Sequence, residues 1–542
     1  MAVTSGAPQT GPRLRRDAGV IGLLFASLGG IIGSGWLLGP LKAATDAGPA
    51  AIIAWIIGGI AVLLLAFTYA ELTTAFPRAG AVIAFPKLSH GSLMATMMSF
   101  VVFLGYVSVA PAEASAVITY ANNYIPGLVD KAGVLTGWGY FASVVLLALF
   151  AFINLLAIRL VLTINSALTW WKLAVPILTI IVFLIVGFHP GNFTSHQFAP
   201  AGPAGVFSAV ATSGIIFSYL GFRQAVELAG ESANPKRNLP IAIVGSVVIG
   251  LIIYLGLQIA FIGAVPPANL ANGWAKLTFT GSFGPFAGLA TLIGMGWLAV
   301  LLYIDAFISP SGTGIIYFTT TSRILYATGK EGLIGGNTFA RLSVAGVPLV
   351  GVLVTFLVGL LFLVPFPSWQ MIIGFISSAT VLSYGTGPVV LMTLRKTMPV
   401  DQYKRPYLLA GGPLIAAIAF IISNFIIFWS GAHTDNFLFG LVLGFFIVYV
   451  AYEAVMGGGL GALQWRGAWW LAPYFFGMWL ITYLGPKSLT GGTGFFSDLW
   501  ASVVLIIFSL VILWLATNSG VIDPEEARAA ILAGEPELLG AD

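Results

Sequence analysis

Long apolar blocks alternate with short polar segments along almost the whole chain of 542 residues. Most blocks hold about 17 to 30 residues, enough for a helix to cross a bilayer core of roughly 30 Å. We predict fourteen membrane-spanning helices, at 18–43, 50–74, 92–125, 138–158, 163–187, 204–230, 239–265, 297–322, 347–364, 370–394, 408–430, 436–456, 469–485 and 499–517. The pattern therefore predicts an all-α polytopic membrane protein.

Two apolar stretches need a separate interpretation. The stretch 284–322 is too long for one span and contains no polar hairpin that would divide it into two. We expect its first part to form a short interfacial or extracellular segment before the eighth helix. The N-terminal Arg13, Arg15 and Arg16 are typical of a signal peptide, but the apolar block after them continues past Gly33 without a cleavage site. We therefore interpret it as a retained first span.

The composition agrees with a membrane-embedded chain and excludes several kinds of chemistry. Hydrophobic residues make up 58% of the sequence and charged residues 8%, whereas soluble domains carry roughly 25% charged residues. The chain has no cysteine, which excludes disulfides and thiol catalysis. Its four histidines lack metal-ligand spacing and it has no P-loop, so we expect no metal site, no cofactor and no ATP-driven step.

The distribution of basic residues predicts the orientation in the membrane. With the N-terminus inside, 17 of the 23 Lys and Arg residues fall on the cytoplasmic side and four outside. The other two, Lys172 and Arg223, lie within predicted spans. This asymmetry follows the positive-inside rule and places both termini in the cytoplasm. Because the net charge of +4 follows the membrane topology, it does not indicate a nucleic-acid partner.

The first span contains four glycines near mid-membrane, in "SLGGIIGSGWLLGP". Glycine weakens a helix interior by roughly 1 kcal/mol relative to alanine, and a break within a bilayer is tolerated only where it is buried or lines a cavity. The amides of Gly33, Ser34 and Gly35 would then begin a second half-helix, whose partial positive charge suits a carboxylate. Alternatively, the glycines only let two helices pack closely.

The sixth span contains a second candidate break, in "GIIFSYLGFRQAVELAGESANPKRNLP". Gly221 follows Ser218 and Tyr219 about halfway through this span, and a charged residue comes soon after it. Interrupted helices in the first and sixth positions indicate a five-plus-five inverted repeat with a binding site between the breaks. The two spans also cross the membrane in opposite directions, as an inverted repeat requires.

The sequence resembles the amino acid–polyamine–organocation (APC) superfamily of permeases. The resemblance covers roughly residues 17–430 and is carried by "GGIIGSGWLLGP", "YAELTTAFPRAGAVIAF", "FSYLGF…ELAGESANPKRNLPIAI" and "SRILYATGKEGL". It implies a LeuT-type fold of ten core helices with additional C-terminal helices. Twelve spans is the usual number in this superfamily, so the predicted helices 13 and 14 are an addition. In more detail, the sequence is similar to the aspartate:proton symporter group of bacterial and archaeal permeases.

We therefore divide the chain by the expected repeat. The expected parts are a cytoplasmic N-terminal segment (1–17), a first repeat (18–200), a second repeat (201–400), C-terminal helices 11–14 (401–517) and a cytoplasmic tail (518–542). The resemblance implies that this protein lies in the plasma membrane of a prokaryote, in contact with lipid. It also implies transport of an amino acid, as a small-molecule substrate, together with protons, and no enzymatic activity.

The resemblance also assigns residues to a substrate site. It implies that Ile32, Gly33, Ser34 and Gly35 bind the substrate carboxylate. It implies that carbonyl groups around Phe217, Ser218, Tyr219 and Gly221 receive the substrate ammonium group, with Phe217 as an aromatic gate. Many relatives have an acidic residue where this chain has Arg223, so specificity for cationic substrates does not carry over.

Four ionisable residues lie well inside predicted spans, and each needs a partner or a function there. Of these, Lys172 matches the superfamily lysine whose ammonium group occupies a sodium position between helices 1, 5 and 8. Burial disfavours a charged lysine, so it could load and release a proton; alternatively, it is a permanent cation paired with an acid. The hydroxyls of Ser309, Ser311 and Thr313 are candidate partners for it.

The other three ionisable residues also have two interpretations each. Glu113, which the superfamily places beside the substrate cavity, and Asp305 in the eighth span are either proton carriers or structural counter-charges. Arg223 either binds a side-chain carboxylate of the substrate or pairs with Glu227 four residues later on the same helix. Glu71 lies near a cytoplasmic helix end, where we expect water to reach it.

The sequence thus predicts a proton-coupled amino acid symporter that takes up its substrate, with aspartate or glutamate as candidates. A neutral amino acid symporter and an amino acid exchanger of the same fold remain alternatives. A channel would need a continuous polar stripe or a filter loop, and a membrane enzyme would need clustered histidines or carboxylates. Neither pattern is present in the sequence.

Overall fold

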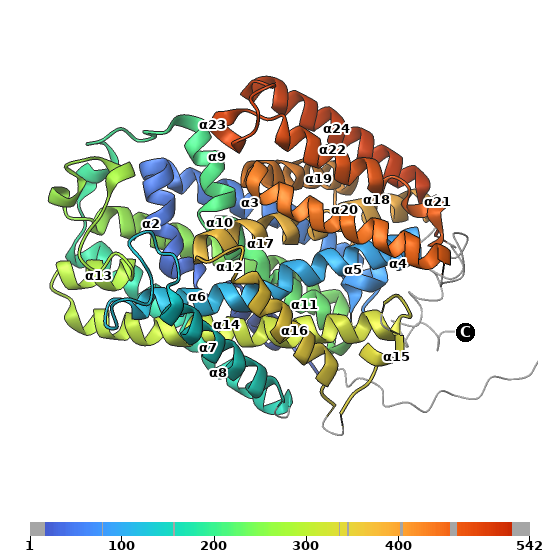
Figure 1. Ribbon diagram of the computed structural model, residues 1–542, viewed down its shortest axis with the longest axis horizontal. Coiled ribbons are helices and arrows are strands. Elements are labelled where there is room, and N and C mark those ends of the chain that lie inside the picture. Colours follow the sequence, from blue (N-terminus) through green and yellow to red (C-terminus); the bar gives the residue numbers. More distant parts are fainter. Residues whose placement is uncertain are drawn as a thin grey trace, which may run out of the picture.

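The structure is a computed structural model that describes residues 17–78, 80–155, 158–334, 336–343, 346–400, 405–455 and 463–522. These residues form helices joined by short loops, with no strand among them (Figure 1). The predicted all-α class is therefore confirmed. The predicted N-terminal segment and cytoplasmic tail lie almost entirely outside the described residues.

The helices of the two predicted repeats follow the apolar blocks of the sequence. The first repeat contains α1 (Val20–Ile31), α2 (Gly35–Ala47), α3 (Ala51–Ala75), α4 (Ala81–His90), α5 (Ser92–Val107), α6 (Val109–Ala121), α7 (Gly137–Leu155) and α8 (Ile158–Val186). The second contains α9 (Gly202–Thr212), α10 (Ile215–Tyr219), α11 (Arg223–Glu227), α12 (Pro235–Ala264), α13 (Pro285–Leu292), α14 (Gly296–Lys330), α15 (Gly336–Phe339), α16 (Leu349–Phe362), α17 (Trp369–Tyr384) and α18 (Thr386–Thr397).

The C-terminal helices form a layer at one edge of the molecule. They are α19 (Gly412–Ser430), α20 (Ala432–Val455), α21 (Trp465–Ala468), α22 (Leu471–Tyr483), α23 (Lys487–Thr490) and α24 (Asp498–Ser519). Helix α22 packs on α20, and α24 packs on α19 and α18 (Figure 1). The added helices 13 and 14, which correspond to α22 and α24, thus cover the outside of the C-terminal pair.

Each predicted span overlaps a helix or a group of consecutive helices. Within the described ranges, ten helices are long and apolar enough to cross a membrane, or eleven if a bent pair counts as one span. Three predicted spans correspond to shorter pieces: the halves α1 and α2 have 12 and 13 residues, α16 has 14 and α22 has 13. The number fourteen therefore stays a prediction.

Large apolar side chains lie on the outer faces of several helices. On α8, Ile177, Ile181 and Ile185 are spaced four residues apart and are 44%, 49% and 77% exposed. On α24, Ile507 and Trp514 are 57% and 65% exposed. Contiguous apolar surface of this kind is a liability in water but is normal for a surface that faces hydrocarbon.

The break in the first span lies where the glycine pattern predicts it. Helix α1 ends at Ile31, residues 32–34 leave the helical path, and α2 begins at Gly35. The broken segments α1 and α2 contact α12, α14 and the α10–α11 region. Both halves are therefore held in the centre of the helix packing, where protein groups rather than lipid surround the irregular backbone.

The break in the sixth span begins earlier than predicted. The 46° bend lies between α9 and α10, at Gly214, whose φ of +87° is in the left-handed region that favours glycine. A Cβ atom at Gly214 would also lie 2.9 Å from the ring of Trp369. Gly221, predicted as the break, lies instead in a 3₁₀ turn (Leu220–Phe222) between α10 and α11. The sequence around Gly214 does not mark this break, because the contact with Trp369 comes from a distant part of the chain.

The long stretch before the eighth span is divided as predicted. Helix α13 ends at Leu292 and the separate helix α14 begins at Gly296. Helix α14 has 35 residues and continues to Lys330, beyond the predicted end at residue 322. It packs against α6, α5, α8 and α16, so it brings its polar residues to the centre of the molecule.

Candidate functional site

The segments beside the two breaks approach backbone to backbone at a pair of glycines, Gly30 at the end of α1 and Gly221 between α10 and α11. A Cβ atom on Gly221 would lie 2.2 Å from the Ile31 amide nitrogen and 2.3 Å from the Gly30 carbonyl carbon. On the other side of the first break, a Cβ atom on Gly35 would lie 2.1 Å from the Ser218 hydroxyl. Glycine is required at Gly221 and Gly35 because the segments of the first and sixth spans approach too closely there for any side chain.

A tyrosine from a third helix links the two breaks further. The hydroxyl of Tyr254 on α12 lies 2.8 Å from the Ile31 carbonyl and 3.1 Å from the Ser218 carbonyl. The structure therefore brings together the residues of the first and sixth spans that the sequence assigned to one site. Nothing local in the sequence of α12 marks Tyr254, whose two partners lie on other segments of the chain.

The N-terminus of α2 holds a carboxylate of the protein itself. The Ser34 amide donates a hydrogen bond of 2.9 Å to Oε2 of Glu113, which lies on α6 and is fully buried. The second carboxylate oxygen, Oε1, is buried and has no hydrogen-bond partner in the described structure. It faces Gly33, where a Cβ atom would lie only 2.4 Å away. Glu113 thus occupies the position predicted for a substrate carboxylate, rather than only lining the cavity.

The C-terminus of α1 holds the buried lysine. The ammonium group of Lys172 on α8 donates to the Gly29 carbonyl at 2.8 Å and to the Thr313 hydroxyl of α14 at 2.7 Å. The Thr313 hydroxyl also lies 3.0 Å from the Gly29 carbonyl and 3.3 Å from the Ile32 carbonyl. Lys172 therefore joins the first, fifth and eighth spans, at the position that the superfamily resemblance implied.

The described acids do not form an ion pair with Lys172 within 4 Å. Asp305 accepts hydrogen bonds from the Trp171 indole at 2.8 Å and from the Ser309 hydroxyl at 2.6 Å. The hydroxyl of Ser311 is buried without a partner among the described atoms. Of the three candidate hydroxyls, therefore, only Thr313 contacts the lysine, and Asp305 links α8 to α14 through neutral groups.

Arg223 lies in a cage of aromatic rings. Its guanidinium carbon lies 4.7 Å from the ring centre of Tyr384, 5.5 Å from that of Tyr69 and 5.6 Å from that of Tyr106. Its Nη1 donates to the Ser383 hydroxyl at 2.6 Å. Cation–π contacts of this kind stabilise a desolvated guanidinium. The rings come from α3, α5 and α17, so no local sequence pattern could have predicted them.

The alternative of a direct Arg223–Glu227 pair is wrong. Among the described ion pairs, none joins these two side chains within 4 Å. The guanidinium points instead into the aromatic cage and to the Ser383 hydroxyl, although both residues lie in the short helix α11 at the spacing of a helical pair. The Nε atom of Arg223 and the Oε1 atom of Glu227 are both buried without a hydrogen-bond partner in the described structure.

The predicted aromatic gate packs against a tryptophan of the tenth span. Phe217 is 7% exposed, and its ring meets the Trp369 ring edge to face with 6.2 Å between centres. The Trp369 indole nitrogen donates a 2.8 Å hydrogen bond to the Ser34 hydroxyl at the first break. Trp369 thus connects both breaks, although the sequence analysis did not single it out.

The expectation that water reaches Glu71 is also wrong. Glu71 on α3 is fully buried, and its two oxygens accept from Arg395 of α18 at 2.5 and 3.1 Å. Its Oε2 also accepts from the Leu409 amide at 2.9 Å, and Arg405 lies 3.5 Å from Oε1. A bidentate carboxylate–guanidinium pair of this kind fixes geometry as well as charge, so Glu71 locks α3 to the end of the tenth span.

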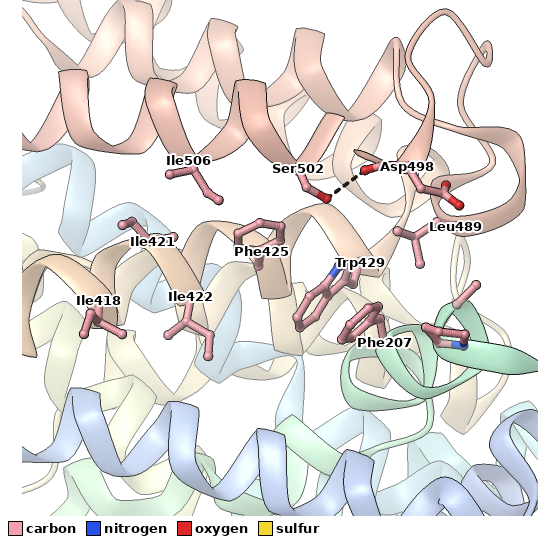
Figure 2. Close-up of a pocket in the computed structure, with 12 residues that line it drawn as sticks. Phe207, Ile418, Ile421, Ile422, Phe425, Trp429, Leu489, Asp498, Ser502 and Ile506 are labelled. Atoms are coloured by element: carbon pink, nitrogen blue, oxygen red, sulfur yellow. Dashed lines mark hydrogen bonds between the residues drawn. The ribbon is translucent and has the colours of Figure 1, made fainter. Parts of the chain in front are cut away.

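An open apolar cavity of about 520 Å³ lies elsewhere, between the outer half of the sixth span and the C-terminal layer. Figure 2 shows Phe207 of α9 beside Trp429 of α19, with Ile506, Ser502 and Asp498 of α24 along the opposite side. None of the predicted site residues lines it. Its apolar lining does not supply the paired charges that a zwitterionic ligand needs, so the meeting point of the breaks remains the candidate site.

Comparison with known proteins agrees with this geometry. The sequence matches the amino acid permease family over residues 19–452. It is 39% identical to the glutamate/serine transporter AimA of Bacillus subtilis, covering 97% of this chain and 98% of that protein. It is 35% identical to the aspartate-proton symporter of the same organism, covering 93% and 97%. The branched-chain amino acid permease BcaP is 26% identical, covering 84% and 95%. This chain therefore belongs to the amino acid permease family and is a multi-pass membrane transporter.

Proposed function

We propose that this protein is a proton-coupled symporter that carries amino acids into the cell. The single observation that carries the proposal is the meeting of two broken helices around two opposite charges, Lys172 and Glu113. Neither has an ion-pair partner among the residues that the structure describes. Such a centre offers groups for both ends of a zwitterion and groups that exchange a proton. Relatives that cover almost the whole chain are named as amino acid transporters, one of them coupled to protons.

The proposed substrate pose uses both breaks. The substrate carboxylate would bind the N-terminus of α2, at Ile32, Gly33, Ser34 and Gly35. The ammonium group would contact carbonyls of the segment Phe217–Gly221, which includes Ser218 and Tyr219. The close contact between Gly35 and Ser218 supports this pose, because it places the residue that begins α2 directly beside the segment Phe217–Gly221.

The proposed proton carriers are Lys172, Glu113 and Asp305. Lys172 is fully buried and touches only neutral oxygens, so no neighbouring acid fixes its charge by direct contact. Glu113 and Asp305 are also fully buried, and each leaves one carboxylate oxygen without a partner among the described atoms. A buried ionisable group without a counter-charge in direct contact titrates readily when its surroundings change.

We propose an acidic amino acid as one substrate. Arg223 is a permanent buried cation whose Nε has no partner among the described atoms, and a guanidinium recognises carboxylates by paired hydrogen bonds. The names of two relatives include glutamate and aspartate. The first of those names also includes serine, so a symporter of neutral amino acids remains an alternative. The second alternative is an amino acid exchanger that moves no net proton.

The orientation and the surroundings are part of the proposal. We place both termini in the cytoplasm of a prokaryotic cell, on the basis of the basic-residue asymmetry. The exposed apolar faces of α8 and α24 would contact lipid. The repeats would span residues 18–200 and 201–400, followed by the C-terminal helices to residue 517.

The test is uptake of labelled amino acids into proteoliposomes that contain the purified protein. Labelled glutamate, aspartate, serine and leucine are compared with and without an inwardly directed pH gradient. The proposal expects at least one of them to accumulate above its external concentration only when the gradient is present. Equal uptake without a gradient would indicate an exchanger or a facilitator, and no uptake of any amino acid would refute the proposal.

A further inference from the structure

We propose that Glu113 is an internal ligand of the substrate-carboxylate site, and that an arriving amino acid displaces it. The inference rests on the proposed function of this site and adds to it a reason why the proton and the substrate must bind together. Its basis is positional: the protein's own carboxylate lies on the amide group to which a substrate carboxylate would bind.

The geometry identifies Glu113 as an occupant of the site. Its Oε2 accepts the Ser34 amide at 2.9 Å, one residue before α2 begins. Its Oε1 is buried, has no partner in the described structure and faces Gly33, where even a methyl group would collide with it. A carboxylate in this position gains a charge-assisted hydrogen bond and the field of a 13-residue helix.

Two carboxylates cannot share this position while both are charged. The Ser34 amide offers one hydrogen, and the two anions would lie within a few ångströms of one another at a buried position. Like charges at that distance force one group to take up a proton, as paired active-site carboxylates do. The substrate carboxylate is the more acidic of the two in solution, so the proton goes to Glu113.

The charge and proton balance then follows. In the free state the site holds the Lys172 cation and the Glu113 anion. On binding, one external proton converts Glu113 to a neutral acid, and the substrate carboxylate takes its place on the Ser34 amide. The substrate brings its own ammonium charge, which the carbonyls of the second break receive. On the cytoplasmic side the substrate leaves, Glu113 loses its proton to the cytoplasm and returns to the amide.

The groups that act on Glu113 electrostatically come from three helices. They are Lys172 of α8, Tyr254 of α12 and Tyr317 of α14. The two tyrosines are neutral at physiological pH, and Lys172 keeps an anion beside it both before and after the exchange. The proton therefore resides on Glu113 in the loaded state, while Lys172 stays charged.

The expected pH dependence has a definite sign. Proton binding to Glu113 opens the site, and substrate binding favours that proton by the reciprocity of linked equilibria. The apparent affinity of the wild-type protein should therefore rise as pH falls, by up to about tenfold per pH unit above the titration range of Glu113 when one proton binds per substrate. In the Glu113→Gln variant this slope should be lost, because the amide cannot take up the proton.

The experiment compares the wild-type protein, Glu113→Gln and Asp435→Asn, each as the full chain in proteoliposomes. Asp435 is the matched control: it is a fully buried carboxylate on α20 that bonds to Ser378 of α17, away from both breaks. Labelled glutamate and serine are the probes, and the readouts are substrate affinity between pH 5 and 8, counterflow exchange and gradient-driven accumulation. We expect Glu113→Gln to keep exchange and lose both the pH slope and accumulation, while Asp435→Asn keeps all three.

A second measurement does not depend on a variant. Infrared difference spectra of the wild-type protein, with glutamate or serine added at fixed pH, should show a carboxylate band replaced by a protonated-carboxyl band. The same change should occur in Asp435→Asn. If the wild type binds substrate without this change, or if Glu113→Gln keeps the full pH slope and still accumulates substrate, the displacement mechanism is overturned. If the wild type binds no amino acid at all, the proposed function itself fails.

Discussion

The glycine contact between the two breaks can be tested with a single methyl group. In Gly221→Ala the new Cβ atom would lie 2.2 Å from the Ile31 nitrogen and 2.3 Å from the Gly30 carbonyl carbon. Both neighbours are backbone atoms of another helix, so no change of side-chain rotamer can relieve the contact. The two half-helices must separate to make room for it.

The size of the effect follows from ordinary contact distances. Non-bonded carbon atoms pack best at about 3.5–4.0 Å, so the segments that carry Gly30 and Gly221 must separate by roughly 1 Å or more. Overpacking of a buried contact costs about 1–3 kcal/mol, and the alanine returns at most about 1 kcal/mol through its helix propensity. We expect a net destabilisation of about 1–2 kcal/mol and a displaced substrate site.

The assay pairs thermal unfolding in detergent, followed by tryptophan fluorescence, with uptake into proteoliposomes. Gly22→Ala is the matched control, because Gly22 lies within α1 and a Cβ atom there meets nothing within 4 Å. We expect Gly221→Ala to lower Tm by several degrees and to lose most uptake, while Gly22→Ala equals or slightly exceeds the wild type in Tm. A Gly221→Ala protein with wild-type Tm and uptake would refute the reasoning.

Three further predictions concern coupling, specificity and topology. Lys172→Met should abolish accumulation against a gradient because it removes the cation that balances Glu113; accumulation equal to the wild type would refute this. Arg223→Ala should weaken the competition of aspartate and glutamate with labelled uptake on the order of 30- to 1000-fold relative to that of alanine and leucine. The reason is that a buried bidentate pair contributes about 2–4 kcal/mol. An equal loss for all four amino acids would assign Arg223 a structural role. A reporter fused after Thr517 should be cytoplasmic, and a reporter between Phe188 and Ala204 external; a periplasmic C-terminus would mean an odd error in the number of spans.

The helices and the first break could be predicted because their causes are local. Apolar blocks long enough to cross a bilayer form helices wherever lipid or other helices surround them. Each block can be recognised from its own residues, without knowledge of its neighbours in the fold. The first break needs only the glycines around Gly33, whose weak helix propensity acts on the residues beside them. The same local reasoning found the separate segment Pro285–Leu292 before the eighth span.

The second break and the partners of the buried charges have causes that are distant in sequence. Gly214 adopts a positive φ beside Trp369, which lies 155 residues later in the chain. Glu71 is buried because Arg395, 324 residues away, folds onto it. From the sequence alone, the end of α3 that carries Glu71 is expected to be exposed to water. It is buried only because the end of the tenth span packs against it. Which partner each charge meets depends on this packing and not on spacing along one helix.

The break in the first span explains how the site holds two opposite charges that do not touch one another. Breaking a helix exposes the C-terminus of one half and the N-terminus of the other, and these ends carry opposite partial charges. The Gly29 carbonyl, from the end of α1, accepts the Lys172 ammonium, and the Ser34 amide, just before α2, donates to the Glu113 carboxylate. Each charge is thus stabilised by the backbone of the break, so any movement of α1 relative to α2 must alter the environment of both. The sequence predicted the amide half of this arrangement; that the protein itself supplies both ions follows only from the positions of α6 and α8.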